Sequence, residues 1–132
     1  LNRLIEATSP QSRITFTYDP LGRCLSRESS EKNREYYLYL NLDEIGSIDP
    51  HLKLKTFKVP ANPQNSVVPV AIELEDKTFA PLLDVQGNIS RLIDVDSKSV
   101  ENQYEYTAFG ESVEAFETLV NPWRYAGKRF DP

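Results

Sequence analysis

Four glycines of this chain close the same kind of four-residue frame, in which a turn-forming residue stands three positions before the glycine. Three frames begin with Asp: Asp19-Pro20-Leu21-Gly22, Asp43-Glu44-Ile45-Gly46 and Asp84-Val85-Gln86-Gly87. A fourth, Thr107-Ala108-Phe109-Gly110, has Thr in that place. The first residues are 24, 41 and 23 positions apart, so the middle interval is slightly under two of the outer ones. A turn that recurs at such spacing predicts a chain built from a repeated unit.

Each frame has the residue types of a type I turn that ends in the left-handed conformation. Asp at the first position accepts a hydrogen bond from the backbone two residues on, Pro at the second presets φ, and Gly at the fourth takes a positive φ. Such a turn joins antiparallel strands, and its glycine forms a bulge that restores the strand twist. The frames therefore predict β-hairpins. We assign a structural role in repeat turns to Tyr18, Asp19, Gly22, Asp43, Gly46, Asp84, Gly87, Phe109, Gly110 and Gly127.

The residues beside the frames alternate as half-buried strands do. Ile14, Phe16 and Tyr18 alternate with threonines, and Tyr104 and Tyr106 alternate with polar residues. The sequence therefore predicts an all-β fold, a single meandering sheet of antiparallel hairpins with about ten short strands. At 132 residues the chain is one domain in length. An open sheet leaves edge strands uncovered, so we expect neighbouring sheet from a longer protein, of which residues 1–132 are a segment.

The remaining strands are expected at Tyr36–Leu42, Leu52–Val59, Val67–Leu74, Thr78–Leu83 and Val100–Tyr106. Pro69 and Pro81 lack the N–H that a ladder needs, so each belongs at an edge or a bulge. The stretch Pro60–Asn65 is expected to be a loop. Ser112–Leu119 is the only helix-like stretch and is expected to form one or two helical turns or a loop. Residues Asn121–Arg129 are expected to be extended.

The balance of charge excludes some functions. The net charge is −5, from 15 basic and 20 acidic side chains, which argues against a general nucleic-acid binder. Lys53, Lys55 and Lys58 form the densest basic run, which we interpret as a solvated strand face or a protected edge. No apolar run approaches the length of a membrane span. Cys24 is the only cysteine, so it forms no internal disulfide and is interpreted as an ordinary strand residue.

No constellation of residues indicates catalysis or a metal. Asp94 and Asp96 are interpreted as an Asx turn, and a single His and a single Cys give no ligand cluster, so no cofactor or metal is expected. Asn88-Ile89-Ser90 matches the glycosylation sequon, which we attribute to chance. Two interpretations stay open for the basic residues around Trp123 and Tyr125: binding of a carbohydrate or acidic partner, or packing against further strands. Those residues are Arg124, Lys128 and Arg129.

The frames also carry a family resemblance. Tyr18-Asp19-Pro20-Leu21-Gly22-Arg23 resembles the tyrosine–aspartate (YD) repeat. Residues 80–131 resemble the RHS (rearrangement hotspot) repeat-associated core domain, in the order and spacing of three stretches. These are Asp84-Val85-Gln86-Gly87-Asn88-Ile89 through Asp94, Tyr104-Glu105-Tyr106-Thr107-Ala108-Phe109-Gly110-Glu111, and Asn121-Pro122-Trp123-Arg124-Tyr125-Ala126-Gly127-Lys128-Arg129-Phe130-Asp131.

The resemblance implies a bacterial RHS polymorphic toxin or delivery protein, secreted or at the cell surface. Its β-sheet shell would enclose a C-terminal toxin, so the partners would be neighbouring repeats and that toxin, with no nucleic acid. The chain would be a wall and not an enzyme, because the self-cleaving Asp-Pro-x-Gly plug of the family lies beyond this segment. Asp19-Pro20-Leu21-Gly22 fits those letters but is interpreted as a repeat turn. The alternatives are a recognition module for carbohydrate or a receptor, and a self-processing fragment.

Overall fold

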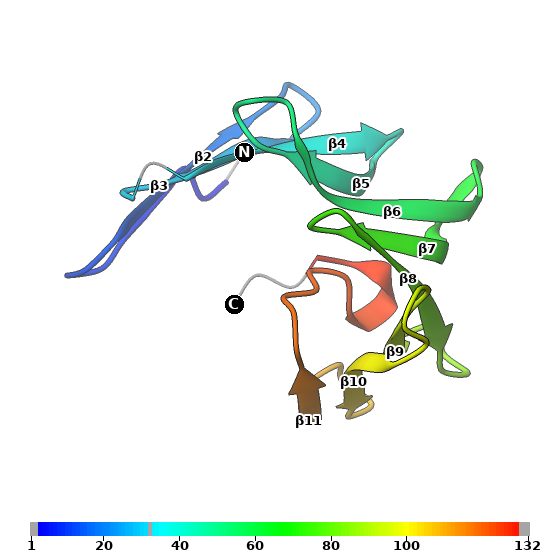
Figure 1. The fold of residues 1–132 in the computed structure, drawn as a ribbon. Helices are drawn as coiled ribbons and strands as arrows, with labels where there is room; N and C mark the ends of the chain where they lie inside the picture. The colour runs from blue at the N-terminus through cyan, green and yellow to red at the C-terminus, as the bar shows by residue number, and fades with distance from the viewer. Residues whose placement is uncertain (1–2, 32, 130–132) are drawn as a thin grey trace.

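A computed structural model describes residues 3–31 and 33–129, and in these residues the chain folds into one sheet of 11 strands. Figure 1 shows how the sheet curves. Each strand pairs with the next one in the chain, and all of these pairings are antiparallel. The strands are β1 Glu6–Thr8, β2 Arg13–Tyr18, β3 Cys24–Ser29, β4 Arg34–Leu40, β5 Asp43–Ile48, β6 Leu54–Asn62, β7 Asn65–Leu74, β8 Lys77–Leu83, β9 Ile89–Asp94, β10 Val100–Tyr106 and β11 Ser112–Glu117. The predicted all-β meander is therefore confirmed.

Three of the four frames form the predicted turn, at Asp19, Asp84 and Thr107. In each, the fourth residue donates its N–H to the carbonyl of the first at 2.9 to 3.0 Å. The side-chain oxygen of the first residue accepts the N–H of the fifth. The closing glycines have φ between 82° and 86°. The outgoing strand then has one extra residue opposite the incoming strand, and this bulge lies three positions after the glycine, at Leu25, Ser90 and Val113, and not at the glycine itself. We call this combination the turn-and-bulge unit.

The turn predicted at Asp43 and Gly46 is wrong, because both residues lie in β5. The chain reverses earlier, at Asn41, whose φ is 57°. Asn tolerates this left-handed conformation better than most residues do. Gly46 is instead required by close approach of β6, since a Cβ there would lie 2.4 Å from the carbonyl oxygen of Thr56.

A turn-and-bulge unit that the frames did not predict lies at Asp49-Pro50-His51-Leu52. The N–H of Leu52 donates to the carbonyl of Asp49 at 3.0 Å, and the carboxylate of Asp49 accepts the N–H of Lys53 at 2.9 Å. Leu52 has the left-handed φ of 64° that glycine has in the other units. Lys55 is the extra residue of the bulge, since Ile48 pairs with Leu54 and Ser47 with Thr56. This unit begins with Asp-Pro, as the unit at Asp19 does, but Leu52 stands where the Asp-x-x-Gly frame has glycine, so the frame does not match it.

The two prolines mark a place where the sheet splits. Strands β7 and β8 pair only from Ile72–Phe79 to Leu74–Lys77. Pro69 and Pro81 lie beyond these pairs, on stretches without a partner from the other strand, and Pro69 also faces a register shift in β6. Their missing N–H groups therefore cost no ladder hydrogen bond, as predicted. Past this point the sheet curls around the C-terminal end of the chain (Figure 1).

Two other local predictions are wrong. The expected loop Pro60–Asn65 is mostly strand, because β6 continues to Asn62 and β7 starts at Asn65. The stretch expected to be helix-like is β11, whose residues pair with the free side of β10. In both cases pairing with a neighbouring strand overrides the local signal of proline or glutamate. The hairpin between Val67–Leu74 and Thr78–Leu83 is confirmed, with its turn at residues 75 and 76.

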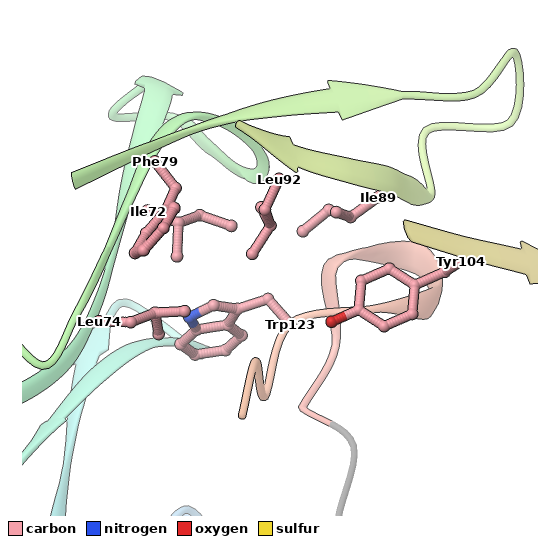
Figure 2. Packing of buried hydrophobic residues seen from close by; sticks show 7 residues of the cluster. All are labelled: Ile72, Leu74, Phe79, Ile89, Leu92, Tyr104 and Trp123. Atoms are coloured by element: carbon pink, nitrogen blue, oxygen red, sulfur yellow. The ribbon is translucent and has the colours of Figure 1, made fainter. Parts of the chain in front are cut away.

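After β11 the chain folds back across the concave side of the sheet (Figure 1). We call residues 118–129 the strap. The strap is partly extended, as predicted, but also contains a 3-10 turn, η1 Tyr125–Gly127, and a bridge between Trp123 and Arg129. Gly127 therefore lies in η1 and not in a hairpin turn. The buried apolar core lies between the strap and the sheet and consists of Ile72, Leu74, Phe79, Ile89, Leu92, Tyr104 and Trp123 (Figure 2).

Candidate functional site

The most elaborate cluster of side chains in the described residues is where the strap meets the concave face. Trp123 is its centre, fully buried and facing Leu74, Ile72 and Leu92 (Figure 2). Its backbone N–H donates to the side-chain amide oxygen of Asn121 at 3.0 Å, which fixes the bend before the indole. The apolar contacts of one large ring thus hold the strap on strands that are distant in the sequence.

The strap forms hydrogen bonds with two of the turn-and-bulge units. Asn88, the fifth residue of the Asp84 unit, accepts the N–H of Ala126 at 2.9 Å and donates to the carboxylate of Asp84 at 2.8 Å. At the Thr107 unit, the hydroxyl of Tyr125 donates to the carbonyl of Ala108 at 3.3 Å. The asparagine of the sequon is therefore buried and its amide is already engaged, so it is a structural anchor in this fold.

A partly buried ion pair fixes the end of the strap. The guanidinium of Arg129 donates to the carboxylate of Glu44 at 2.6 Å, and its Nη1 lies 4.0 Å from the carboxylate of Glu35. The guanidinium carbon also lies 4.8 Å from the ring centre of Tyr37 and 5.1 Å from that of Trp123. Burial raises the pKa of Glu44, and the hydrogen bond and charge of Arg129 oppose that effect.

Lys58 is a buried cation beneath the strap. Its Nζ donates to the carbonyl of Gly127 at 3.0 Å and lies 4.8 Å from the ring centre of Trp123, while the whole residue is only 2% exposed. Burial lowers the pKa of Lys58. The prediction of a solvated lysine face therefore holds for Lys53 and Lys55, which are exposed, but is wrong for Lys58.

A small polar cavity of about 170 Å³ lies beside this cation, and Asp43 and Lys128 line it. The carboxylate of Asp43 accepts a hydrogen bond from Ser66 and lies 3.4 Å from Nζ of Lys128. The hydrogen bond from Ser66, followed by the charge of Lys128, lowers the pKa of Asp43. Asp43 was expected in a turn, and it instead joins β5 to β7 and the strap.

The basic residues around Trp123 and Tyr125 mostly pack inward. Arg124 forms an ion pair with Glu117 at 2.7 Å, and its guanidinium lies 5.0 Å from the ring centre of Tyr104. Arg129 contacts Glu44 as described, while only Lys128 is exposed. Between the two interpretations left open by the sequence, these contacts favour packing, although within the chain's own sheet.

The turn residues predicted from the sequence do not converge on one site. Strands β2, β8 and β10 run in the same direction, so the turns at Asp19, Asp84 and Thr107 lie at one end of the sheet, and Asp49 follows β5 at the other. The hydroxyl of Tyr18 donates to the carbonyl of Leu4 at 2.8 Å. Phe109 is 91% exposed at the tip of its turn.

Asp94 forms the predicted Asx turn, because its carboxylate accepts the N–H groups of Asp96 and Ser97 at 2.8 and 3.0 Å. Within residues 3–31 and 33–129, no three His, Cys, Asp or Glu side chains are grouped as a metal site requires. In the same part of the chain no helix is long and apolar enough to cross a membrane.

The sequence missed Glu44, Lys58 and the unit at Asp49 as members of this architecture. The Asp-Pro pair at residues 49 and 50 was an available signal for the last of these. Comparisons with family models and with curated proteins gave no match. The resemblance to RHS proteins therefore rests on the residues quoted above and enters the proposal below on that basis.

Proposed function

We propose that this chain is a wall segment of an RHS-type shell, whose β-sheet encloses a C-terminal toxin in a secreted or surface-exposed bacterial delivery protein. The main observation behind the proposal is that the 11 strands of the described residues form one open antiparallel sheet in the order of the sequence. Each strand is added beside the previous one, so the architecture extends by repeating hairpins. The resemblance to RHS proteins supplies the identity of the larger assembly.

The two edges of the sheet support this proposal. In the described part of the chain, β1 and β11 each pair on one side only. The three residues of β1 are exposed, and β11 exposes Val113 and Phe116 to 66% and 58%. Free edges with apolar side chains are an aggregation hazard that natural proteins normally cover. Neighbouring repeats of a shell would pair with both edges and cover these residues.

The role we propose for the strap cluster is structural and not enzymatic. Its cations bind carboxylates, a carbonyl and aromatic rings of the chain itself. Trp123 is buried beneath them, so the cluster offers its contacts to the strap and not to a substrate. The strap would brace the curve of the wall from its concave side.

Recognition of carbohydrate is less well supported. Several tyrosine hydroxyls that would bind sugars donate instead to backbone carbonyls, as those of Tyr18, Tyr39 and Tyr106 do at 2.8 to 2.9 Å. Arginine side chains lie over Tyr18 and Tyr39. These rings are therefore occupied by the chain's own side chains.

Amide hydrogen exchange tests the wall directly. The chain alone is compared with the same residues inside the product of the full reading frame that encodes them. We expect the outward-facing amides of β1 and β11 to exchange rapidly in the chain alone and slowly in the full protein, with the central amides of β7 slow in both. Rapid exchange at both edges of the full protein would contradict a continuing sheet.

Enclosure is tested by limited proteolysis of the full protein. We expect the polypeptide C-terminal to the shell to resist a protease while the shell is folded and to be digested when it is expressed separately. Equal digestion in both states would rule out enclosure without affecting the evidence on the sheet edges.

A further inference from the structure

The edge of the sheet at β11 offers hydrogen-bonding groups to a further strand. Within the described residues β11 pairs with β10 only, as the last strand of the sheet (Figure 1). Residues of an antiparallel ladder point their N–H and C=O groups alternately at the partner strand and away from it. The N–H of Thr118 donates to the carbonyl of Glu101 at 3.1 Å, on the β10 side. The backbone groups of Glu117 and Ala115 therefore point to the free edge.

This edge is better suited to pairing than the one at β1. Strand β11 has six residues, and Val113 and Phe116 expose apolar side chains on it. Strand β1 has three residues, and Glu6 is held in an ion pair with Arg13 of β2 at 2.8 Å. A short, charged edge strand resists pairing, whereas a longer edge with exposed apolar side chains favours it. The features that select a partner strand are therefore expected at β11.

Two glutamates are directly opposite each other in the last ladder of the sheet. Glu105 of β10 is in register with Glu114 of β11, and cross-strand partners share one face of a sheet. Like charges in this arrangement destabilise the pairing of the strands. Glu105 is exposed, and so is Glu111, which precedes β11. A cation on the next strand, in register with Glu114, would offset this repulsion.

Two arginines approach this end of the sheet, and neither is beside Glu114. Arg124 of the strap forms an ion pair with Glu117 at 2.7 Å. Arg91 of β9 is in register with Gln103 of β10, which places it two strands away from β11. The free side of β11 is therefore the position at which an added positive charge acts most directly on Glu114.

A second copy of the chain does not supply this charge. The edge strand β1, Glu6-Ala7-Thr8, contains an acidic residue and no basic one. The same is true of β11 itself, whose charged residues are both glutamates. Pairing of β11 with either edge of another copy would add carboxylates to the glutamate pair. The charge of the edge is instead complementary to a strand of different, basic sequence.

We propose that β11 pairs with a strand that carries lysine or arginine in register with Glu114 and a β-branched or aromatic residue in register with Phe116. These positions are two residues apart and share one face, so the pattern is basic-x-apolar in a parallel strand and the reverse in an antiparallel one. The cation forms a cross-strand ion pair, and the apolar residue packs on the ring of Phe116. This pairing rests on the proposed function, in which the added strand belongs to a neighbouring repeat of the shell.

Titration of the folded chain with a defined peptide, followed by amide chemical shifts in nuclear magnetic resonance, tests the proposal. The probe is an acetylated, amidated heptapeptide with lysine at its centre, valine two residues to either side of the lysine and threonine elsewhere. The comparison peptide has glutamate at the centre. We expect the lysine peptide to bind about tenfold more tightly, because attraction across the ladder replaces repulsion, and to shift the amides of Ala115 and Glu117. Equal affinities, or unchanged shifts at these two amides, would overturn the proposal.

Matched variants separate this edge from the general negative charge of the chain. We expect Glu114→Gln to remove most of the preference for lysine. Glu105→Lys supplies a cation on β10 and should reduce the preference as well. Glu31→Gln removes the same charge from an exposed residue between β3 and β4 and should leave the preference unchanged. Thermal unfolding confirms that each variant is folded. A preference that persists in both Glu114→Gln and Glu105→Lys, or that falls equally in Glu31→Gln, would overturn the role of the glutamate pair.

Amide exchange in the full protein distinguishes this proposal from the shell itself. Protected amides at Ala115 and Glu117 of the full protein, together with no preference for the lysine peptide, would overturn the role of charge and leave the shell supported. Rapid exchange of these amides in the full protein, together with a clear preference for the lysine peptide, would contradict the shell. That second result would support recognition of a basic strand from a separate polypeptide.

Discussion

Arg129 and Glu44 are 85 residues apart in the sequence, yet Nε of the arginine lies 2.6 Å from the carboxylate of the glutamate. Their side chains are 19% and 17% exposed, so solvent screens the pair only weakly. The contact joins the end of the strap to β5, on the far side of the core from β9 and β10. The strap is therefore attached to β5 through Arg129 and to Asn88, just before β9, through Ala126.

We expect Arg129→Met to destabilise the fold by about 2–3 kcal/mol, because it leaves the mostly buried carboxylate of Glu44 without its partner. The double variant Arg129→Met with Glu44→Gln should recover a large part of that loss, since the uncompensated charge is gone. Denaturant unfolding of the two single variants and the double variant gives the coupling energy.

An exposed pair provides the control for this measurement. Lys53 and Asp76 also approach to 2.6 Å, but their side chains are 62% and 67% exposed. Lys53→Met should therefore change stability by less than about 1 kcal/mol. Equal losses for Lys53→Met and Arg129→Met would show that burial of the Glu44 pair has no energetic effect.

Leu52→Gly is expected to stabilise the protein by about 0.5–1 kcal/mol, which is unusual for a glycine substitution. Leu52 holds a φ of 64°, a conformation that costs a side chain of this type roughly 1–2 kcal/mol. The side chain is 76% exposed, so little apolar contact is lost. Thermal unfolding measures the difference, and a lower midpoint in the variant would mean that Leu52 makes a favourable contact that outweighs its strain.

Gly87→Val provides the reverse test in an equivalent position. Outside residues 86–88, no atom lies within 4 Å of a Cβ built at Gly87, so the cost of the substitution comes from the φ of 84°. We expect a loss of about 1–3 kcal/mol for this β-branched residue, measured by the same thermal unfolding. Unchanged stability would contradict the conformational account of the turn-and-bulge unit.

These turns show why the sequence predicted the fold class better than the position of each turn. Alternating residues and the Asp-x-x-Gly frames identify hairpins through short-range chemistry, which is the same in every unit. The frame at Asp43 failed because Asn41 takes the left-handed conformation first, and the unit at Asp49 was missed because Leu52 does so without being glycine. Local propensity predicts which residue types adopt the left-handed conformation most easily. The pairing of the strands decides which residue of a turn has to adopt it.

The candidate site was less predictable than the fold, because it depends on contacts between distant segments. Lys58 belongs to a lysine-rich run that suggests exposure, yet it is buried and its Nζ contacts Trp123 and Gly127 of the strap. Glu44 has no local feature that distinguishes it from the other glutamates, and the sequence leaves Arg129 open between binding a partner and packing against further strands. Such pairs become visible only when the curvature of the sheet brings β5 and the strap together.

Trp123→Phe is expected to cost about 1–2 kcal/mol, much less than the roughly 4 kcal/mol expected for Trp123→Ala. The indole N–H is buried and has no hydrogen-bond partner, so phenylalanine removes an unsatisfied donor while keeping most of the ring. Alanine instead leaves a large cavity between the strap and the core. Chemical denaturation followed by circular dichroism measures both variants. Equal losses would indicate that the N–H contributes a stabilising interaction, for example with an ordered water molecule.

The stability of the fold should fall in acid partly through Asp94. Hydrogen bonds from the N–H groups of Ser97 and Asp96 lower the pKa of Asp94 below its usual value, and the charge of Lys77 adds to this effect. A carboxyl whose pKa is lower in the folded state contributes stability above its unfolded pKa, about 3.9, and loses it as the pH falls through the folded value. We therefore expect Asp94→Asn to be less stable than the parent at neutral pH, and the two proteins to converge below about pH 4.

Denaturant unfolding of the parent and Asp94→Asn at a series of pH values measures this convergence, and their difference cancels the contributions of the other carboxyls. Lys77→Met is the control, because Lys77 is 64% exposed and lies 3.3 Å from the carboxylate of Asp94. It should leave most of the pH dependence in place, since the backbone N–H groups are the main cause of the lowered pKa. A difference between the parent and Asp94→Asn that stays constant with pH would mean that the turn depends on the shape of this side chain and not on its charge.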